Sequence, residues 1–165
     1  MDLGNTSVVL GEALGETLPA DAVGRIPHGH YELVFELLDV PQAPNYIELQ
    51  RRMEETRRVR LTGWGPFITL EREPYAPSIV NESLEVWLGH PSEHPVSDSA
   101  HTDYWRTTLD GRLFLLRGYD EDSVARIAAG TVFDVTMPVW RVGEALLFVS
   151  RLAVFFVANP QITLI

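Results

Sequence analysis

A β-hairpin near the middle of the chain constrains the fold more than any other feature of the sequence. The run "DYWRTTLDGRLFLLRGY", residues 103–119, places Asp110 and Gly111 between two β-prone stretches. An Asp-Gly pair is a strong signal for a tight turn between strands, because both residues tolerate the positive φ angles that such turns require. We therefore predict an antiparallel hairpin at 103–118.

Two helices are predicted, one on each side of this hairpin in the sequence. Residues 45–58 form the first, because Asn45 can cap its free amides, Glu48 occupies the capping-box position, and apolar residues recur on one face. Pro138 favours the start of the second helix, at about 139–158, which is apolar almost throughout. So much apolar surface indicates that this helix is buried on several sides.

Strand patterns fill much of the remaining chain. The terminal "QITLI" needs a sheet neighbour, so either it completes the sheet or the chain is a fragment of something longer. A short amphipathic helix fits residues 31–38 nearly as well as a strand does. A short helix is also predicted at 120–130. The predicted strands are residues 31–38, 59–73 with a bend at its glycines, 83–89, 131–137 and 161–165.

The predicted fold class is α+β. Helices and strands mix without a βαβ repeat, which indicates a mostly antiparallel sheet packed against the C-terminal helix and the helix at 45–58. A length of 165 residues suits one domain, residues 1–165, in which residues 1–24 are weakly patterned.

Composition excludes several classes of chemistry. The chain has neither cysteine nor lysine, so its 13 basic residues are all arginine. These absences exclude disulfides, thiolate sites, a Walker A lysine and Schiff-base catalysis. The net charge of −10 and the pI near 4.8 disfavour direct binding to nucleic acids or anionic membranes. With no signal-peptide pattern and Arg151 inside its most apolar stretch, the chain is expected to be cytoplasmic.

A histidine-rich segment raises the question of a metal site. The run "GHPSEHP", residues 89–95, contains His90, Glu93 and His94 in the H-x-x-E-H order of inverted zinc proteases. That motif requires a helix, whereas prolines bracket the segment here, so an exposed loop and no cofactor are the favoured interpretation. The alternative is a metal-dependent hydrolase with zinc or another divalent metal held by His90, His94, His101 and Asp103.

Tryptophans and arginines supply the candidate binding residues. The four tryptophans lie in or beside predicted strands and helix starts, where they can line one sheet face. Packing in the core is the simpler interpretation, and an aromatic pocket or partner surface with arginine anchors is the alternative. No catalytic residue is assigned. The candidate ligand- or partner-binding residues are Trp64, Trp87, Trp105, Arg106, Arg117, Trp140 and Arg141.

Five arginines between residues 51 and 60 form a second basic feature. Glutamates are interleaved with them on the predicted helix, which favours a solvated helix face. Nucleic-acid binding through this helix is a further alternative, and it predicts a steep dependence on salt.

The segments "LTGWGPF", "SLEVWLG", "DYWRTTLDGRLFLLRGYDED" and "FDVTMPVWRVGEALLFVSRLA" resemble a region of bacterial Schlafen-like proteins, often labelled transcriptional regulators. The resemblance covers roughly residues 25–165 and concerns the region C-terminal to the AlbA-type ATP-binding or DNA-binding domain of those proteins. The AlbA-type domain itself has no counterpart in this chain, and no catalytic role attaches to the matching positions. Those positions are Gly63, Trp64, Trp87, Gly89, Trp105, Arg106, Asp110, Gly111, Arg112, Arg117, Gly118, Trp140, Arg141, Gly143 and Glu144.

The resemblance implies an accessory or sensing module that acts beside a nucleotide-binding partner. Together with the absence of a recognised catalytic motif, it favours a non-enzymatic module in a bacterial regulatory or defence setting. Such a module is expected to bind a partner protein, a second copy of itself or a small ligand.

Overall fold

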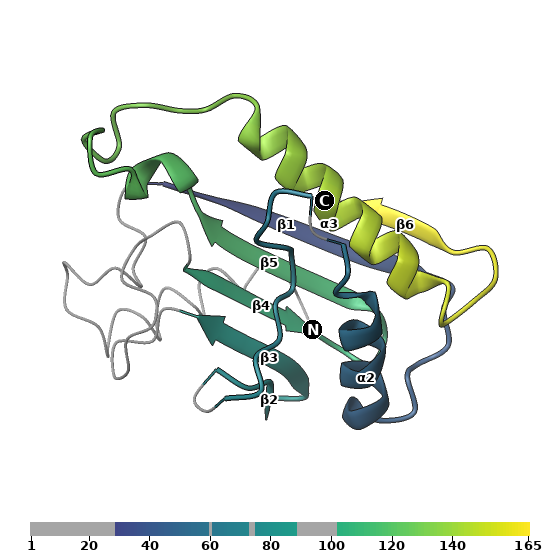
Figure 1. Cartoon of the computed structure of the whole chain (residues 1–165). Coiled ribbons are helices and arrows are strands. Elements are labelled where there is room, and N and C mark those ends of the chain that lie inside the picture. Colours follow the sequence, from purple (N-terminus) through teal and green to yellow (C-terminus); the bar gives the residue numbers. More distant parts are fainter. Residues whose placement is uncertain (1–28, 60, 73–74, 89–101) are drawn as a thin grey trace.

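The computed structural model describes residues 29–59, 61–72, 75–88 and 102–165. Its centre is a six-stranded antiparallel sheet with the order β2-β3-β4-β5-β1-β6 (Figure 1). The α+β class predicted from the sequence is therefore confirmed. The strands are β1 (His30–Leu38), β2 (Ser78–Val80), β3 (Ser83–Leu88), β4 (Asp103–Thr107), β5 (Arg112–Gly118) and β6 (Gln161–Leu164).

The predicted hairpin is formed by β4 and β5. In its turn, the Gly111 N–H donates to the Thr108 carbonyl at 3.2 Å, and the Thr108 N–H donates to the Arg112 carbonyl at 3.1 Å. Gly111 has a φ of +85°, and a Cβ at this position would lie 3.0 Å from the side chain of Leu37. Glycine is thus required both by the backbone angle and by the close approach of β1.

Two helices, α2 (Tyr46–Thr56) and α3 (Met137–Ala153), lie on one face of the sheet (Figure 1). As predicted, Asn45 caps α2, and its side-chain oxygen accepts a hydrogen bond from the Glu48 N–H at 2.9 Å. Pro138 stands in the first turn of α3, where a missing backbone N–H costs nothing. Among the described residues, no helix has the length and apolar character needed to cross a membrane.

The main hydrophobic core lies between the sheet and these helices. Phe35, Trp105 and Leu115 point into it from the central strands, and Met53 and Phe148 close it from the two helices. Each of these five side chains is at most 1% exposed. Burial of this apolar surface is the main force that holds α2 and α3 on the sheet.

The opposite face of the sheet carries a smaller apolar cluster of Tyr104, Phe114 and Leu116. Glu85 lies on this face and accepts a hydrogen bond from the Tyr104 hydroxyl at 2.9 Å. Burial raises the pKa of Glu85 above its ordinary value, and the hydrogen bond from Tyr104 and the charge of Arg106 oppose this effect only partly.

Glu85→Gln is expected to make the stability less dependent on pH. Because the native-state pKa is raised, the native protein retains the Glu85 proton to a higher pH than the unfolded chain does. This contribution is full below the ordinary glutamate pKa and is lost as pH rises through the raised value. The urea midpoint of the wild type should therefore fall relative to that of the variant as the pH rises above the ordinary pKa of glutamate, about 4. Identical pH profiles for the two proteins would contradict this prediction.

The strand predicted at 59–73 is wrong. Its described residues form an irregular segment that crosses the helix-bearing side of the sheet (Figure 1). Gly63 has a φ of +90° and Phe67 a φ of +50°, so the backbone turns twice where an extended strand was expected. We call residues 61–70 the Trp64 segment.

Two other predicted elements differ from the structure. Residues 131–136 form an irregular connection to α3 instead of a strand, and Phe133 and Val135 in it are exposed. The helix predicted at 120–130 is a single 3-10 turn, η4 (Asp120–Ser123). Residues 131–136 pair with no strand among those the structure describes.

The C-terminal region follows the prediction in part. α3 ends at Ala153 rather than near residue 158, and it is buried on one side only, which corrects the expectation of burial on several sides. The chain then turns back, and β6 pairs antiparallel with β1, with Leu164 opposite Phe35. The apolar C-terminal residues thus have the sheet neighbour that the sequence predicted, with β6 as an edge strand.

Candidate functional site

An ion pair between Asp103 and Arg117 lies at one end of the β4–β5 hairpin. The two residues are direct cross-strand partners and point to the helix-bearing side of the sheet. Their side chains are 0% and 1% exposed. The guanidinium donates from Nε to Oδ1 at 2.6 Å and from Nη2 to Oδ2 at 2.5 Å. This bidentate geometry is the one that makes a buried arginine–carboxylate pair favourable.

The same pair holds the Trp64 segment. Arg117 donates from Nη1 to the Trp64 carbonyl at 3.0 Å and from Nη2 to the Gly65 carbonyl at 2.7 Å. In return, the indole N–H of Trp64 donates to Oδ2 of Asp103 at 2.8 Å. An irregular backbone can lie over a sheet only if its polar groups find partners, and this ion pair supplies them.

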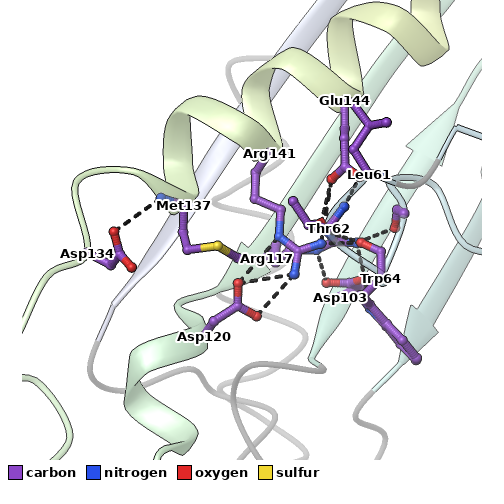
Figure 2. A network of polar contacts seen from close by, with 11 residues as sticks. Leu61, Thr62, Trp64, Asp103, Arg117, Asp120, Asp134, Met137, Arg141 and Glu144 are labelled. Atoms are coloured by element: carbon purple, nitrogen blue, oxygen red, sulfur yellow. Dashed lines mark hydrogen bonds and ion pairs between the residues drawn. The ribbon is translucent and has the colours of Figure 1, made fainter.

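Arg141, in the first turns of α3, joins the network from the other side (Figure 2). It donates to the Trp64 carbonyl and lies against the carboxylate of Asp120, with Nη2 at 3.1 and 3.2 Å from the two oxygens. The Trp64 carbonyl therefore accepts hydrogen bonds from two arginines that belong to a strand and a helix far apart in the sequence.

Glu144 fixes the start of the Trp64 segment. It is fully buried, and its Oε1 accepts hydrogen bonds from the backbone N–H groups of Leu61 and Thr62, the latter at 2.7 Å. Its Oε2 accepts the Thr62 hydroxyl at 2.7 Å and lies 3.7 Å from Nη1 of Arg141. We call Asp103, Arg117, Asp120, Arg141 and Glu144 the ionic network.

The electrostatics of this network suit a structural role. Burial lowers the pKa of Arg117, but the charge and hydrogen bonds of Asp103 raise it more, so the guanidinium remains charged. Burial also raises the pKa of the nearby Tyr31 hydroxyl, which the two arginines of the network only partly oppose, so Tyr31 stays neutral. Because the carboxylates of the network are engaged by arginines or backbone amides, none of them is placed as a general base.

A pocket of about 460 Å³ opens beside the Trp64 segment. Arg57 and Arg58 at the C-terminal end of α2 are exposed and bring two positive charges to it. Neither forms an ion pair with any residue that the structure describes, in contrast to Arg51 and Arg52, which pair with glutamates on α2. The pocket is lined by Arg57, Arg58, Gly63, Trp64, Gly65, Pro66, Ile68, Thr69 and Leu70.

The structure brings together three of the residues that the sequence singled out for binding, namely Trp64, Arg117 and Arg141. Trp105 is fully buried in the main core, where its indole N–H donates to the Ile68 carbonyl at 2.7 Å. Trp140 is 56% exposed on α3.

The remaining two candidates, Trp87 and Arg106, lie on the face of the sheet away from the helices. Trp87 packs against the smaller apolar cluster, and Arg106 donates to the Ser83 hydroxyl at 2.8 Å. The expectation that all four tryptophans line one sheet face is therefore wrong, because strand alternation sends Trp87 and Trp105 to opposite sides.

The predicted metal ligands do not form a site within the described part of the chain. His90, His94 and His101 lie outside the described residues. Asp103 is described, and both of its oxygens accept hydrogen bonds from Arg117 or Trp64. No cluster of three metal-binding side chains occurs among the residues that the structure describes.

Sequence reasoning missed the residues that complete this site. Asp120 and Glu144 belong to the ionic network but were not named as binding residues. Arg57 and Arg58 were placed on a helix face expected to be solvated, with nucleic-acid binding as the alternative. One signal was available: Arg141 and Glu144 stand three residues apart on the predicted helix, a spacing at which opposite charges lie side by side. The pairing of Asp103 with Arg117 depends on the hairpin register, which the Asp110-Gly111 turn signal does not determine.

Comparisons with known proteins add no assignment. No protein-family model, curated protein or solved structure matches this chain significantly.

Proposed function

We propose that this protein is a non-enzymatic binding module and that the pocket beside Trp64 takes a small organic anion with a flat apolar body. One observation carries the proposal: Arg57 and Arg58, which are exposed and form no ion pair with any described residue, stand at a pocket that Trp64 also lines. The volume of about 460 Å³ falls within the range typical of small-molecule sites.

The chemistry of the lining favours this class of ligand. Guanidinium groups bind carboxylates and phosphates through paired hydrogen bonds, which a lone ammonium group cannot match. Trp64, Ile68 and Leu70 offer apolar surface for the rest of the ligand. In a chain of net charge −10, the two exposed arginines at this pocket create a local positive potential that attracts an anion there.

The ionic network prepares the pocket before any ligand binds. Arg117 and Arg141 donate hydrogen bonds to the Trp64 carbonyl, and Asp103 accepts one from the indole N–H of Trp64. With its polar groups already engaged, Trp64 contributes a fixed aromatic surface. A site on fixed groups loses little conformational entropy on binding, which raises affinity without additional contacts.

The wider setting rests on the resemblance described above. It supports an accessory or sensing role in a bacterial regulatory or defence protein, located in the cytoplasm, in which the bound anion or a partner protein is the signal. The metal-dependent hydrolase and the nucleic-acid-binding module are alternatives, and no contact among the described residues favours either over ligand binding.

Removing one pocket arginine is expected to weaken anion binding. Phenyl phosphate serves as the probe, and isothermal titration gives its Kd for the wild type, Arg57→Gln and Arg58→Gln. Each exposed charge contributes about 1 kcal/mol, so each variant should raise the Kd roughly fivefold.

Arg126→Gln is the matched control, because Arg126 is exposed and lies outside the pocket lining. It should leave the Kd unchanged. Equal Kd values for all four proteins, or equal binding of the neutral benzyl alcohol, would refute the proposed site.

A further inference from the structure

The outer side of α3 is apolar although it faces solvent. Trp140 is 56% exposed, Leu147 36% and Val154, which follows the helix directly, 60%. Surface helices of globular proteins normally carry charged and polar residues on this side. Here the polar residues Arg141 and Glu144 point inward to the ionic network instead.

The exposed residues alternate in size along a narrow stripe. Trp140, Gly143, Leu147, Ser150 and Val154 are spaced by three and four residues, which places them along one seam of the helix. All five are exposed, and a Cβ built on Gly143 would meet nothing within 4 Å. The small residues therefore leave notches that are open to a neighbour.

We propose that this seam is the contact surface between two copies of the chain, packed with their α3 helices antiparallel about a two-fold axis. If the axis passes midway between Leu147 and Ser150, Leu147 of one copy lies level with Ser150 of the other. By the same symmetry Val154 lies level with Gly143. Leu147 and Val154 then each meet a notch, as ridges-into-grooves packing requires, while Trp140 lies level with Val157 beyond the end of the helix.

Two α3 helices packed in parallel would not place large residues opposite small ones. It would set Gly143 against Gly143 and Trp140 against Trp140, which leaves a void at one layer and a steric conflict at another. The alternation of large and small residues is thus complementary to itself only in the antiparallel direction. This self-complementarity points to a second copy as the occupant.

The charge distribution makes the outer side of α3 the side on which two copies repel one another least. Two copies with a net charge of −10 each repel one another over most approaches. The exposed side of α3 carries no carboxylate, and its only charged residue is Arg151. In the antiparallel register Arg151 lies level with Leu146 of the second copy, which its aliphatic stem can cover while the guanidinium remains in water.

The size of the seam indicates a weak dimer. A helix of 17 residues is about 25 Å long, so a contact along one helix buries less than the roughly 800 Å² per partner of standard stable interfaces. We therefore expect a dimer that dissociates on dilution.

Sedimentation equilibrium over a range of protein concentrations tests the proposal. The wild type should approach twice the chain mass of 18.6 kDa at high concentration. Leu147→Glu places a charge in the seam and should remain monomeric. Ile47→Glu is the matched control, because Ile47 is 81% exposed on α2, outside the seam, and this variant should dimerise like the wild type.

Gly143→Leu separates the interface from the fold. Space is open around Gly143 in the single chain and leucine favours a helix, so the thermal midpoint measured at low concentration should not fall. The same leucine fills the notch that receives Val154, so the dimer should weaken. Retained dimerisation in this variant would overturn the proposed seam.

Cross-linking determines the direction of the helices. The chain contains no cysteine, so Leu147→Cys and Ser150→Cys each introduce a single thiol. On oxidation, a mixture of the two variants should form more cross-linked dimer than either variant alone, because Leu147 faces Ser150. Preferential cross-linking of one variant with itself, or a wild type that is monomeric at every concentration, would overturn the proposal. Neither outcome bears on ligand binding beside Trp64, which these experiments do not measure.

Discussion

Asp103→Asn is expected to lower the free energy of unfolding by about 3–5 kcal/mol, because it leaves a buried arginine without its counter-charge. The asparagine has nearly the same shape, but it removes the negative charge and turns one of the two acceptor oxygens into an amide donor that faces other donors. Arg117 is 1% exposed, and water cannot replace the lost partner. Urea denaturation followed by circular dichroism gives the value.

Glu55→Gln is the matched control for Asp103→Asn. Glu55 forms an ion pair with Arg51, but its side chain is 43% exposed. Exposed pairs contribute only about 0–1 kcal/mol, so this carboxylate-to-amide change should hardly alter stability. Similar losses from the two substitutions would contradict the view that burial makes the Asp103–Arg117 pair critical.

A double variant tests how Arg117 acts. Replacing Asp103 by Leu and Arg117 by Met removes both charges together, which is often far less costly than removing one. The rescue should remain partial, because the carbonyls of Trp64 and Gly65 also lose the hydrogen bonds that Arg117 donates. Complete rescue would show that holding the Trp64 segment contributes nothing to stability.

Phe67→Ala is expected to have a comparable effect, a loss of about 3–5 kcal/mol, because it removes the apolar anchor of the Trp64 segment. The Phe67 ring is fully buried and stacks on Phe148 with the ring centroids 4.9 Å apart. It also contacts Trp105 edge-on at 6.3 Å. The cavity left by alanine would lie between the sheet and α3.

Phe133→Ala controls for the loss of a phenyl ring as such. Phe133 is 52% exposed in the connection before α3, so its truncation should cost about 1 kcal/mol or less. Phe67→Ala should also weaken binding of phenyl phosphate, since the segment that lines the pocket loses its anchor. A variant that loses stability but binds with unchanged Kd would show that Phe67 does not position the pocket.

The parts of the fold that were predictable depend on local signals. The hairpin follows from Asp110 and Gly111, and the start of α2 follows from the cap at Asn45, because turns and caps are determined within a few residues. The Trp64 segment could not be predicted in this way. Its conformation depends on partners far away in the sequence, namely Arg117 and Arg141, and on the core position of Phe67.

In the candidate site, too, the residue types were predictable from the sequence, whereas their arrangement in space was not. Trp64, Arg117 and Arg141 were named because their residue types suit binding, but the sequence did not show that they meet. Their convergence depends on the hairpin register and on the direction of the inner side of α3, which are set by packing. Arg57 and Arg58 look like any other helix-end arginines until the pocket beside them is seen.

The proposed function depends on anion binding in the pocket beside Trp64. The most direct test is an amide-proton and indole-proton NMR titration with phenyl phosphate, in which four indole N–H signals report on four distinct places. Trp64 lines the pocket, Trp105 lies in the core, Trp87 on the opposite face, and Trp140 on the outer side of α3.

We predict that the Trp64 indole signal shifts progressively to saturation, that the other three hardly move, and that benzyl alcohol fails to reproduce the shift. A Trp64 signal that stays in place throughout the titration would contradict anion binding in this pocket.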